Sequence, residues 1–203
     1  MTDDGASTEV TWPDLLAHPA VWEESVLGAP IGLMAFHGGL ETGTAEIARR
    51  AAALSGASLY VVEQPAELRW HVPSRSVDPH HSPQLRDWLD HVEVAVALHG
   101  YGRVRQPRRV LIGGTNRALA GRLAVVLGAR LPELQVVADL DDIPRELRGL
   151  HPANPVNRPS GRGVQVELPP SARDPRLDRH LPGRVGEALA ELVRGYLDAT
   201  TLP

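Results

Sequence analysis

Two histidines and two glutamates of this 203-residue chain stand next to short apolar segments. His37 directly follows the apolar run 31–36, and three residues separate it from Glu41. His99 and Glu167 each follow a further apolar stretch. A catalytic zinc requires three nitrogen or oxygen ligands, an open position for water and a carboxylate that transfers protons. These residue types therefore predict a catalytic metal centre.

The spacing favours a centre that the fold assembles over a zinc finger. Two glycines between His37 and Glu41 predict a tight loop that turns both side chains toward one point. His99 comes from a separate segment, and the chain has no cysteine, which excludes thiolate ligands and disulfides. A histidine at a strand end can instead be exposed or only hydrogen-bonded, so both interpretations stay open. Other side chains that offer a ligand atom are Glu46, His71, His80, His81 and His151.

Strand-like and helix-like segments alternate along the chain. The pattern predicts strands at 31–36, 59–62, 94–98, 109–112, 134–138 and 164–168, and helices at 12–16, 44–54, 83–89, 116–127 and 185–197. This alternation predicts a single α/β domain with a mixed, mainly parallel sheet flanked by helices. We expect residues 1–30 to form a variable lead-in and residues 31–203 to form the domain.

Sites in α/β sheets lie beyond the carboxyl ends of the strands. His37, His99 and Glu167 all stand at such ends, which supports one shared site. Clusters of proline and glycine predict long loops at 63–82 and 151–163.

The composition excludes several classes of protein. Hydrophobic residues make up 42% of the chain, as in globular proteins, and the formal net charge is −4. No basic patch with interleaved aromatic residues occurs, so we expect no nucleic-acid partner. No apolar run approaches the ~20 residues that span a membrane. The N-terminal residues are acidic and polar, unlike a secretory signal, so we expect a cytoplasmic protein.

Five motifs follow one another between residues 31 and 175. They are His37-Gly-Gly-Leu-Glu41-Thr-Gly-Thr-Ala-Glu-Ile-Ala, Val-Ala-Leu-His99-Gly-Tyr, Gly113-Gly-Thr-Asn116, Asn154-Pro-Val-Asn157-Arg158, and Gly163-Val-Gln-Val-Glu167 with Arg173. In this order they resemble the phage-type poly-γ-glutamate hydrolase family. The resemblance implies a zinc-dependent hydrolase with a fold similar to that of the zinc carboxypeptidases.

The resemblance also implies roles for individual residues. His37, Glu41 and His99 would bind the zinc, with Glu46 as the alternative carboxylate ligand, and Glu167 would act as the general base. The residues implied to lie near the substrate are polar or basic: Asn157, Arg158 and Arg173.

We therefore expect a zinc-activated water to attack an amide bond, with a γ-glutamyl compound or another acidic peptide as the substrate. An arginine such as Arg158 or Arg162 would bind a free carboxylate of the substrate in a bidentate way. A zinc amidase for cell-wall peptides, or a non-catalytic module that binds a metal or a carboxylate, are the alternatives. The choice between endo and exo cleavage and the oligomeric state stay open.

Overall fold

The computed structural model describes residues 10–102 and 108–201, so residues 1–9 of the expected lead-in lie outside the described part. In these residues seven strands form one sheet in the order β1-β3-β2-β4-β7-β5-β6. The strands are β1 Trp22–Val26, β2 Ala29–Gly38, β3 Ala57–Glu63, β4 Val94–Gly100, β5 Arg109–Ile112, β6 Gln135–Val137 and β7 Gly163–Leu168.

The centre of the sheet is parallel. β3, β2, β4 and β7 run in the same direction, whereas β1 and β5 pair antiparallel with β3 and β7. β6 is parallel to β5. The predicted α/β fold with a mixed, mainly parallel sheet is therefore confirmed.

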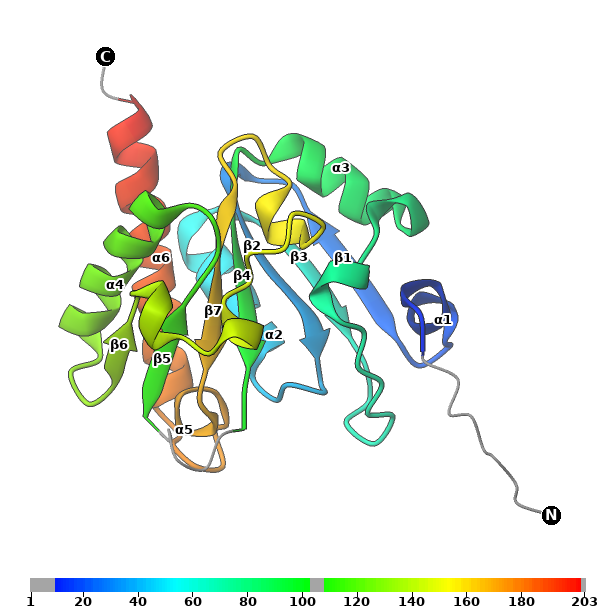
Figure 1. Ribbon diagram of the computed structural model, residues 1–203, viewed down its shortest axis with the longest axis horizontal. Coiled ribbons are helices and arrows are strands. Elements are labelled where there is room, and N and C mark those ends of the chain that lie inside the picture. The colour runs from blue at the N-terminus through cyan, green and yellow to red at the C-terminus, as the bar shows by residue number, and fades with distance from the viewer. Residues whose placement is uncertain (1–9, 103–107, 202–203) are drawn as a thin grey trace.

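Helices cover both faces of this sheet (Figure 1). They are α1 Trp12–Ala17, α2 Thr44–Ser55, α3 Pro83–His91, α4 Arg117–Arg130, α5 Pro170–Arg173 and α6 Leu181–Thr201. Short 3₁₀ turns occupy Ser74–Ser76, Pro79–His81, Leu140–Asp142, Arg145–Leu147 and Pro155–Asn157. Within the described residues, no helix has both the length and the apolar character that crossing a membrane requires.

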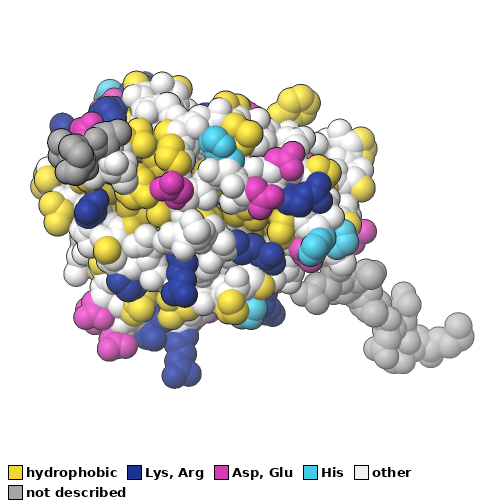
Figure 2. Space-filling model, turned by 90° about the horizontal axis from the view of Figure 1, so that it is seen from above, with side chains coloured by type: hydrophobic (Ala, Val, Ile, Leu, Met, Phe, Trp, Pro, Cys, Tyr) yellow, Lys and Arg dark blue, Asp and Glu magenta, His cyan; other side chains and the backbone are white. Residues whose placement is uncertain are grey.

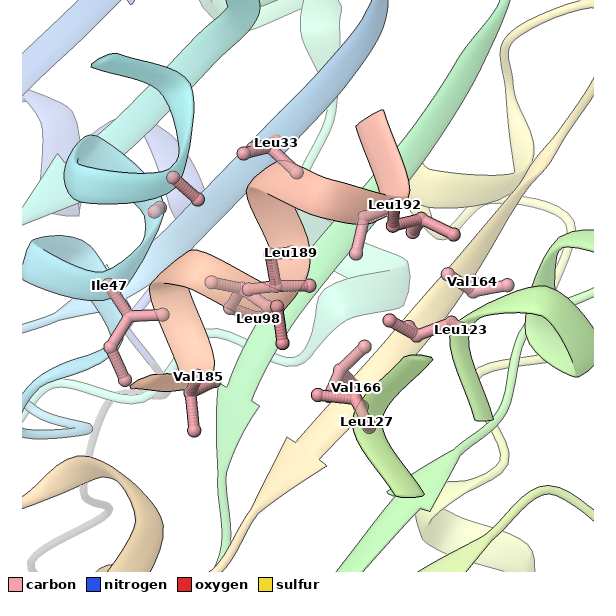
Figure 3. Packing of buried hydrophobic residues seen from close by; sticks show 14 of the residues in the cluster. Leu33, Ile47, Leu98, Leu123, Leu127, Val164, Val166, Val185, Leu189 and Leu192 are labelled. Atoms are coloured by element: carbon pink, nitrogen blue, oxygen red, sulfur yellow. The ribbon is translucent and has the colours of Figure 1, made fainter. Parts of the chain in front are cut away.

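Two hydrophobic clusters, one on each side of the sheet, hold the layers together. The larger one joins strand residues such as Leu33, Leu98 and Val166 to α2, α4 and α6 (Figure 3). The smaller one packs the opposite face against α1 and α3 and contains the buried rings of Trp12 and Trp88. Because helices or loops cover both faces, the central strands read as continuous apolar runs in the sequence.

The N-terminal part of the described chain adds to the sheet. β1 pairs with β3 along residues 22–26 and forms one edge of the sheet. Its pattern Trp-Glu-Glu-Ser-Val lacks clean alternation, and Trp22 is 67% exposed, so the sequence analysis did not predict this strand. On the face shown in Figure 2, acidic and basic side chains are scattered among hydrophobic ones, in keeping with the small net charge.

Candidate active site

Side chains of three potential ligand residues meet where β2 and β4 end. The Nδ1 atom of His37 lies 3.2 Å from Nδ1 of His99 and 3.2 Å from Oε1 of Glu41. The distance between Nδ1 of His99 and Oε2 of Glu41 is 3.5 Å. Both imidazoles are almost fully buried, at 1% and 3% exposure. Parallel pairing of β2 with β4 thus brings together residues that lie far apart in the chain.

The loop after β2 returns Glu41 to His37. Gly39 has φ +77°, and a Cβ there would overlap the backbone oxygen of Gln64, so only glycine fits this position. The N–H of Glu41 then donates to the carbonyl of His37 at 2.9 Å. Oε2 of Glu41 accepts a hydrogen bond from the N–H of Gly100 at 2.9 Å. The tight loop predicted from the two glycines is therefore present, whereas Glu46 is exposed on α2.

A contact with the backbone orients the imidazole of His37. Nε2 of His37 lies 2.8 Å from the carbonyl oxygen of Val72, which can only accept a hydrogen bond. Nε2 therefore donates to this carbonyl, and Nδ1 is the ring nitrogen that faces His99 and Glu41. Nε2 of His99 is buried and has no hydrogen-bond partner among the described residues.

Mutual electrostatics keep Glu41 ionised. Burial acts to raise the pKa of Glu41, but the charges of His37 and His99 and their hydrogen bonds hold that pKa well below its ordinary value. Burial acts to lower the pKa of His99, yet the neighbouring Glu41 and Glu167 raise it above the usual value. A buried carboxylate that faces two imidazole nitrogens is a donor set that suits a divalent cation such as zinc.

A further imidazole lies at the entrance of this cluster. Ligand atoms of His37, Glu41 and His71 all lie within 4.8 Å of one another, so these three residues form a group that could hold a metal ion. His71 is exposed and comes from the loop between β3 and α3. From the sequence, His71 was one of the further residues that offer a ligand atom, and no role was predicted for it.

Glu167 lies beside the cluster on the adjacent strand. In the parallel pairing of β4 with β7 it is the partner of His99, and its side chain is 3% exposed. Nε2 of Gln165 donates to Oε1 of Glu167 at 2.8 Å, and Nδ2 of Asn154 donates to Oε1 of Gln165 at 2.8 Å. Burial raises the pKa of Glu167, while the charge of His99 and the Gln165 hydrogen bond oppose that rise. The chain of amides orients this carboxylate.

One cavity of about 610 Å³ is lined by His37, Glu41, His99 and Glu167, and its volume is typical of a small-molecule site. Basic side chains of two 3₁₀ turns, Arg75 and Arg145, line it as well. Neither of these arginines, nor Gln165, was predicted as a site residue from the sequence. The arginines lie in irregular segments without a motif, so no sequence signal separated them from the other arginines.

Two of the residues that the family resemblance implies to lie near the substrate, Asn157 and Arg158, have different positions relative to this cavity. Oδ1 of Asn157 accepts from Oγ1 of Thr115 at 2.8 Å, and its Nδ2 donates to the carbonyls of Gly149 and His151. Asn157 thus ties its own turn to Thr115 and to the segment 149–151, and it does not line this cavity. The next residue, Arg158, lines a neighbouring cavity.

Arg173 supports the loop that carries Glu41. Its Nη1 donates to the carbonyl of Thr42 at 2.8 Å and its Nε to the carbonyl of Leu168 at 3.3 Å. The guanidinium packs on Gly100, where a Cβ would overlap it. Burial lowers the pKa of Arg173, and the charges of Glu41 and Glu167 oppose this effect.

The model of the poly-gamma-glutamate hydrolase family matches residues 15–180 of this chain. A solved bacteriophage poly-gamma-glutamate hydrolase is 25% identical with a TM-score of 0.74, and the match covers 89% of this chain and 91% of that one. The zinc-free apo form of YndL gives 23% identity and a TM-score of 0.69 over 90% and 92% of the two chains.

A third solved structure, the N-acetylmuramoyl-L-alanine amidase AmiC2 of Nostoc punctiforme, is similar in fold, with 15% identity and a TM-score of 0.54 over 84% of this chain and 99% of that one. No curated protein matches the chain significantly. The family match extends over most of the chain and confirms the family expected from the five motifs. The chain therefore belongs to the poly-gamma-glutamate hydrolase family and is a hydrolase.

Proposed function

We propose that this enzyme hydrolyses γ-glutamyl amide bonds with a zinc ion bound by His37, Glu41 and His99. One observation carries the proposal: the side chains of His37, Glu41 and His99 approach one another pairwise to 3.5 Å or less, next to a separate buried carboxylate. Membership of the poly-gamma-glutamate hydrolase family supports the choice of substrate.

The donor set fits zinc. Two imidazole nitrogens and one carboxylate oxygen are ligands that catalytic zinc sites use, and the bound nitrogens would be the Nδ1 atoms. The N–H of His37 that bonds Val72 keeps this imidazole in the tautomer that leaves Nδ1 free for the metal. When bound, zinc polarises the amide carbonyl and lowers the pKa of water to ~7. His71 is the further nitrogen nearest this set.

Glu167 serves as the general base in this proposal. Its carboxylate takes a proton from the attacking water and later gives it to the leaving amine. Burial supports this role because it raises the pKa of Glu167 toward the working range of a base. The hydrogen bond from Gln165 occupies Oε1 and leaves Oε2 for the proton.

Basic side chains at the cavity supply affinity for an acidic substrate. Arg145 is exposed, lines the cavity, and has no ion-pair partner in the described part of the chain. We assign to it a free carboxylate of the glutamyl residue next to the scissile bond, because guanidinium binds carboxylate in a bidentate way. Arg173 keeps the Glu41 loop in place through the carbonyl of Thr42.

Metal analysis together with a substrate panel tests this function. Purified protein is measured for bound zinc by mass spectrometry and is then assayed on poly-γ-glutamate, α-linked polyglutamate and muropeptides. We expect about one zinc per chain and release of amines from the γ-linked polymer above all. Cleavage of muropeptides alone would replace the proposed substrate with a cell-wall peptide. Absence of zinc from an active enzyme would overturn the metal assignment.

A further inference from the structure

A second cavity, of about 520 Å³, adjoins the one over His37 and Glu167. Pro73 and Arg75 line both cavities, so the two adjoin at these residues. A second segment also contributes to both, because His151 lines the first cavity and Ala153 the second. We call the two adjoining cavities together the groove; its lining includes the histidine cluster in the first cavity and Arg158 in the second.

The groove is lined by basic groups that the protein does not neutralise. Arg75 forms no hydrogen bond or ion pair with any described residue, and Nε of Arg158 donates a long hydrogen bond of 3.4 Å to the carbonyl of Ala153. His81 adds an imidazole to the second cavity. The acidic residue there, Asp78, accepts a hydrogen bond from the N–H of His80 at the start of a 3₁₀ turn.

Some arginines outside the groove are instead paired with glutamates. Arg49 bonds Glu24 and Glu63 at 2.8 and 2.7 Å, and Arg50 bonds Glu187 at 2.6 Å. Such pairs satisfy the guanidinium within the protein itself. The arginines of the groove keep their donors available for a ligand.

We propose that the second cavity is an anionic subsite, which binds carboxylates of the substrate polymer at a distance from the scissile bond. This inference rests on the proposed function. A γ-linked glutamyl chain bears one free α-carboxylate per residue. When the scissile amide bond of such a chain lies next to Glu167, the rest of the chain presents further carboxylates along its length. Arg75 binds one at the junction of the cavities, and Arg158 binds the next in the second cavity, each through the fork of the guanidinium.

The subsite makes the enzyme prefer long substrates. A di-γ-glutamyl compound fits within the first cavity, which alone has the volume of a site for a drug-sized ligand. Only a longer chain reaches Arg158. Binding energy from this remote contact therefore raises kcat/KM for the polymer. It does not change kcat/KM for the short compound, which cannot reach Arg158.

The test compares kcat/KM for long poly-γ-glutamate with kcat/KM for a di-γ-glutamyl amide in Arg158→Ala and Arg158→Glu. We expect the long-to-short ratio to fall about fivefold in the alanine variant, as for the loss of one solvent-exposed charge pair, and further in the glutamate variant. Arg179→Ala is the matched control, because Arg179 is exposed and lines neither cavity. It removes the same charge and should leave the ratio unchanged.

Binding to an inactive variant supplies a readout without turnover. Glu167→Gln protein is titrated with fluorescent poly-γ-glutamate at low and high salt, with and without Arg158→Glu. We expect Arg158→Glu to weaken binding at low salt and to matter less at high salt, since salt screens exposed charges. An unchanged ratio together with unchanged binding would overturn the subsite and leave the proposed function intact. A wild-type enzyme that cleaves no γ-glutamyl substrate would refute both.

Discussion

His99 and Glu167 lie on strands buried on both faces, whereas Arg75, Arg145 and Arg158 lie in or next to 3₁₀ turns at the surface. The strand residues are held in register by backbone pairing, and His37, Glu41 and His99 approach one another pairwise to 3.5 Å or less. The turn residues have no such support. Proton transfer needs geometry accurate to fractions of an ångström, while recognition of a flexible acidic chain tolerates looser placement. We therefore expect strand substitutions to affect turnover and turn substitutions to affect substrate preference.

The largest effect is expected at Glu41, the proposed carboxylate ligand of the metal. Glu41→Gln should lose bound zinc and nearly all activity, because the amide removes the negative charge that faces His37 and His99. Metal content and kcat are measured together. Glu46→Gln is the matched control, since Glu46 is exposed on α2, and its activity should stay within about twofold of the wild type. Loss of zinc in Glu46→Gln with retention in Glu41→Gln would assign the ligand to Glu46.

The next largest effect is expected at Glu167, the proposed general base. Glu167→Gln should keep zinc and lower kcat by roughly 10²–10⁴, the usual contribution of general acid–base catalysis. The isosteric amide accepts no proton, and the fold should persist because the side chain keeps its volume. Steady-state kinetics and metal analysis check both parts. A variant with normal kcat would show that another group takes the proton.

Removal of the amide that bonds Glu167 should have an intermediate effect. Gln165→Leu removes a hydrogen bond that lowers the pKa of Glu167, so that pKa should rise further. Because the base acts when ionised, activity is lost as the pH falls through its pKa, and the acidic limb of kcat/KM should move to higher pH. We expect kcat to fall about tenfold, as for one hydrogen bond to a charged group.

Gln135→Leu is the control for this substitution, because Gln135 is exposed on the edge strand β6 and does not line the cavity. It should leave both kcat and the acidic limb in place. If Gln165→Leu also retained the wild-type limb, the hydrogen bond would have no part in setting the base.

The smallest effect is expected at the surface turns. Arg145→Ala should raise KM for poly-γ-glutamate about fivefold and change kcat little, because an exposed guanidinium contributes about 1 kcal/mol at most. The increase should shrink at high salt. A large fall in kcat with constant KM would mean that Arg145 acts in the transition state and that the comparison between strands and turns is too simple.

Much of the fold follows from local patterns. The apolar run 31–36, the glycines before Glu41 and the helix pattern from Thr44 predicted β2, its tight loop and α2 to within a few residues at each end. β1 was not predicted because an edge strand is half exposed and its sequence Trp-Glu-Glu-Ser-Val shows no regular alternation. α5 was missed because its four residues are too few for a periodic signal.

Some residues of the candidate site could likewise be predicted from the sequence, and others could not. Residue types at strand ends indicated His37, His99 and Glu167, because the carboxyl ends of parallel strands share one edge of the sheet. Asn157 belonged to a motif, yet its hydrogen bonds to Thr115 and to two carbonyls give it a structural place in the loop. The motif alone did not show whether Asn157 binds the substrate or stabilises the loop.

Residue order alone thus determined the α/β class, the strands that deliver the histidines and the chemistry of their side chains, since these depend on near neighbours. Three-dimensional packing determined that Glu41 and not Glu46 faces both imidazoles, that Gln165 orients Glu167, and that Arg75 joins two cavities. Those contacts join segments that are distant in the chain or depend on the course of a loop. They are selected by burial and sheet register, which no local pattern encodes.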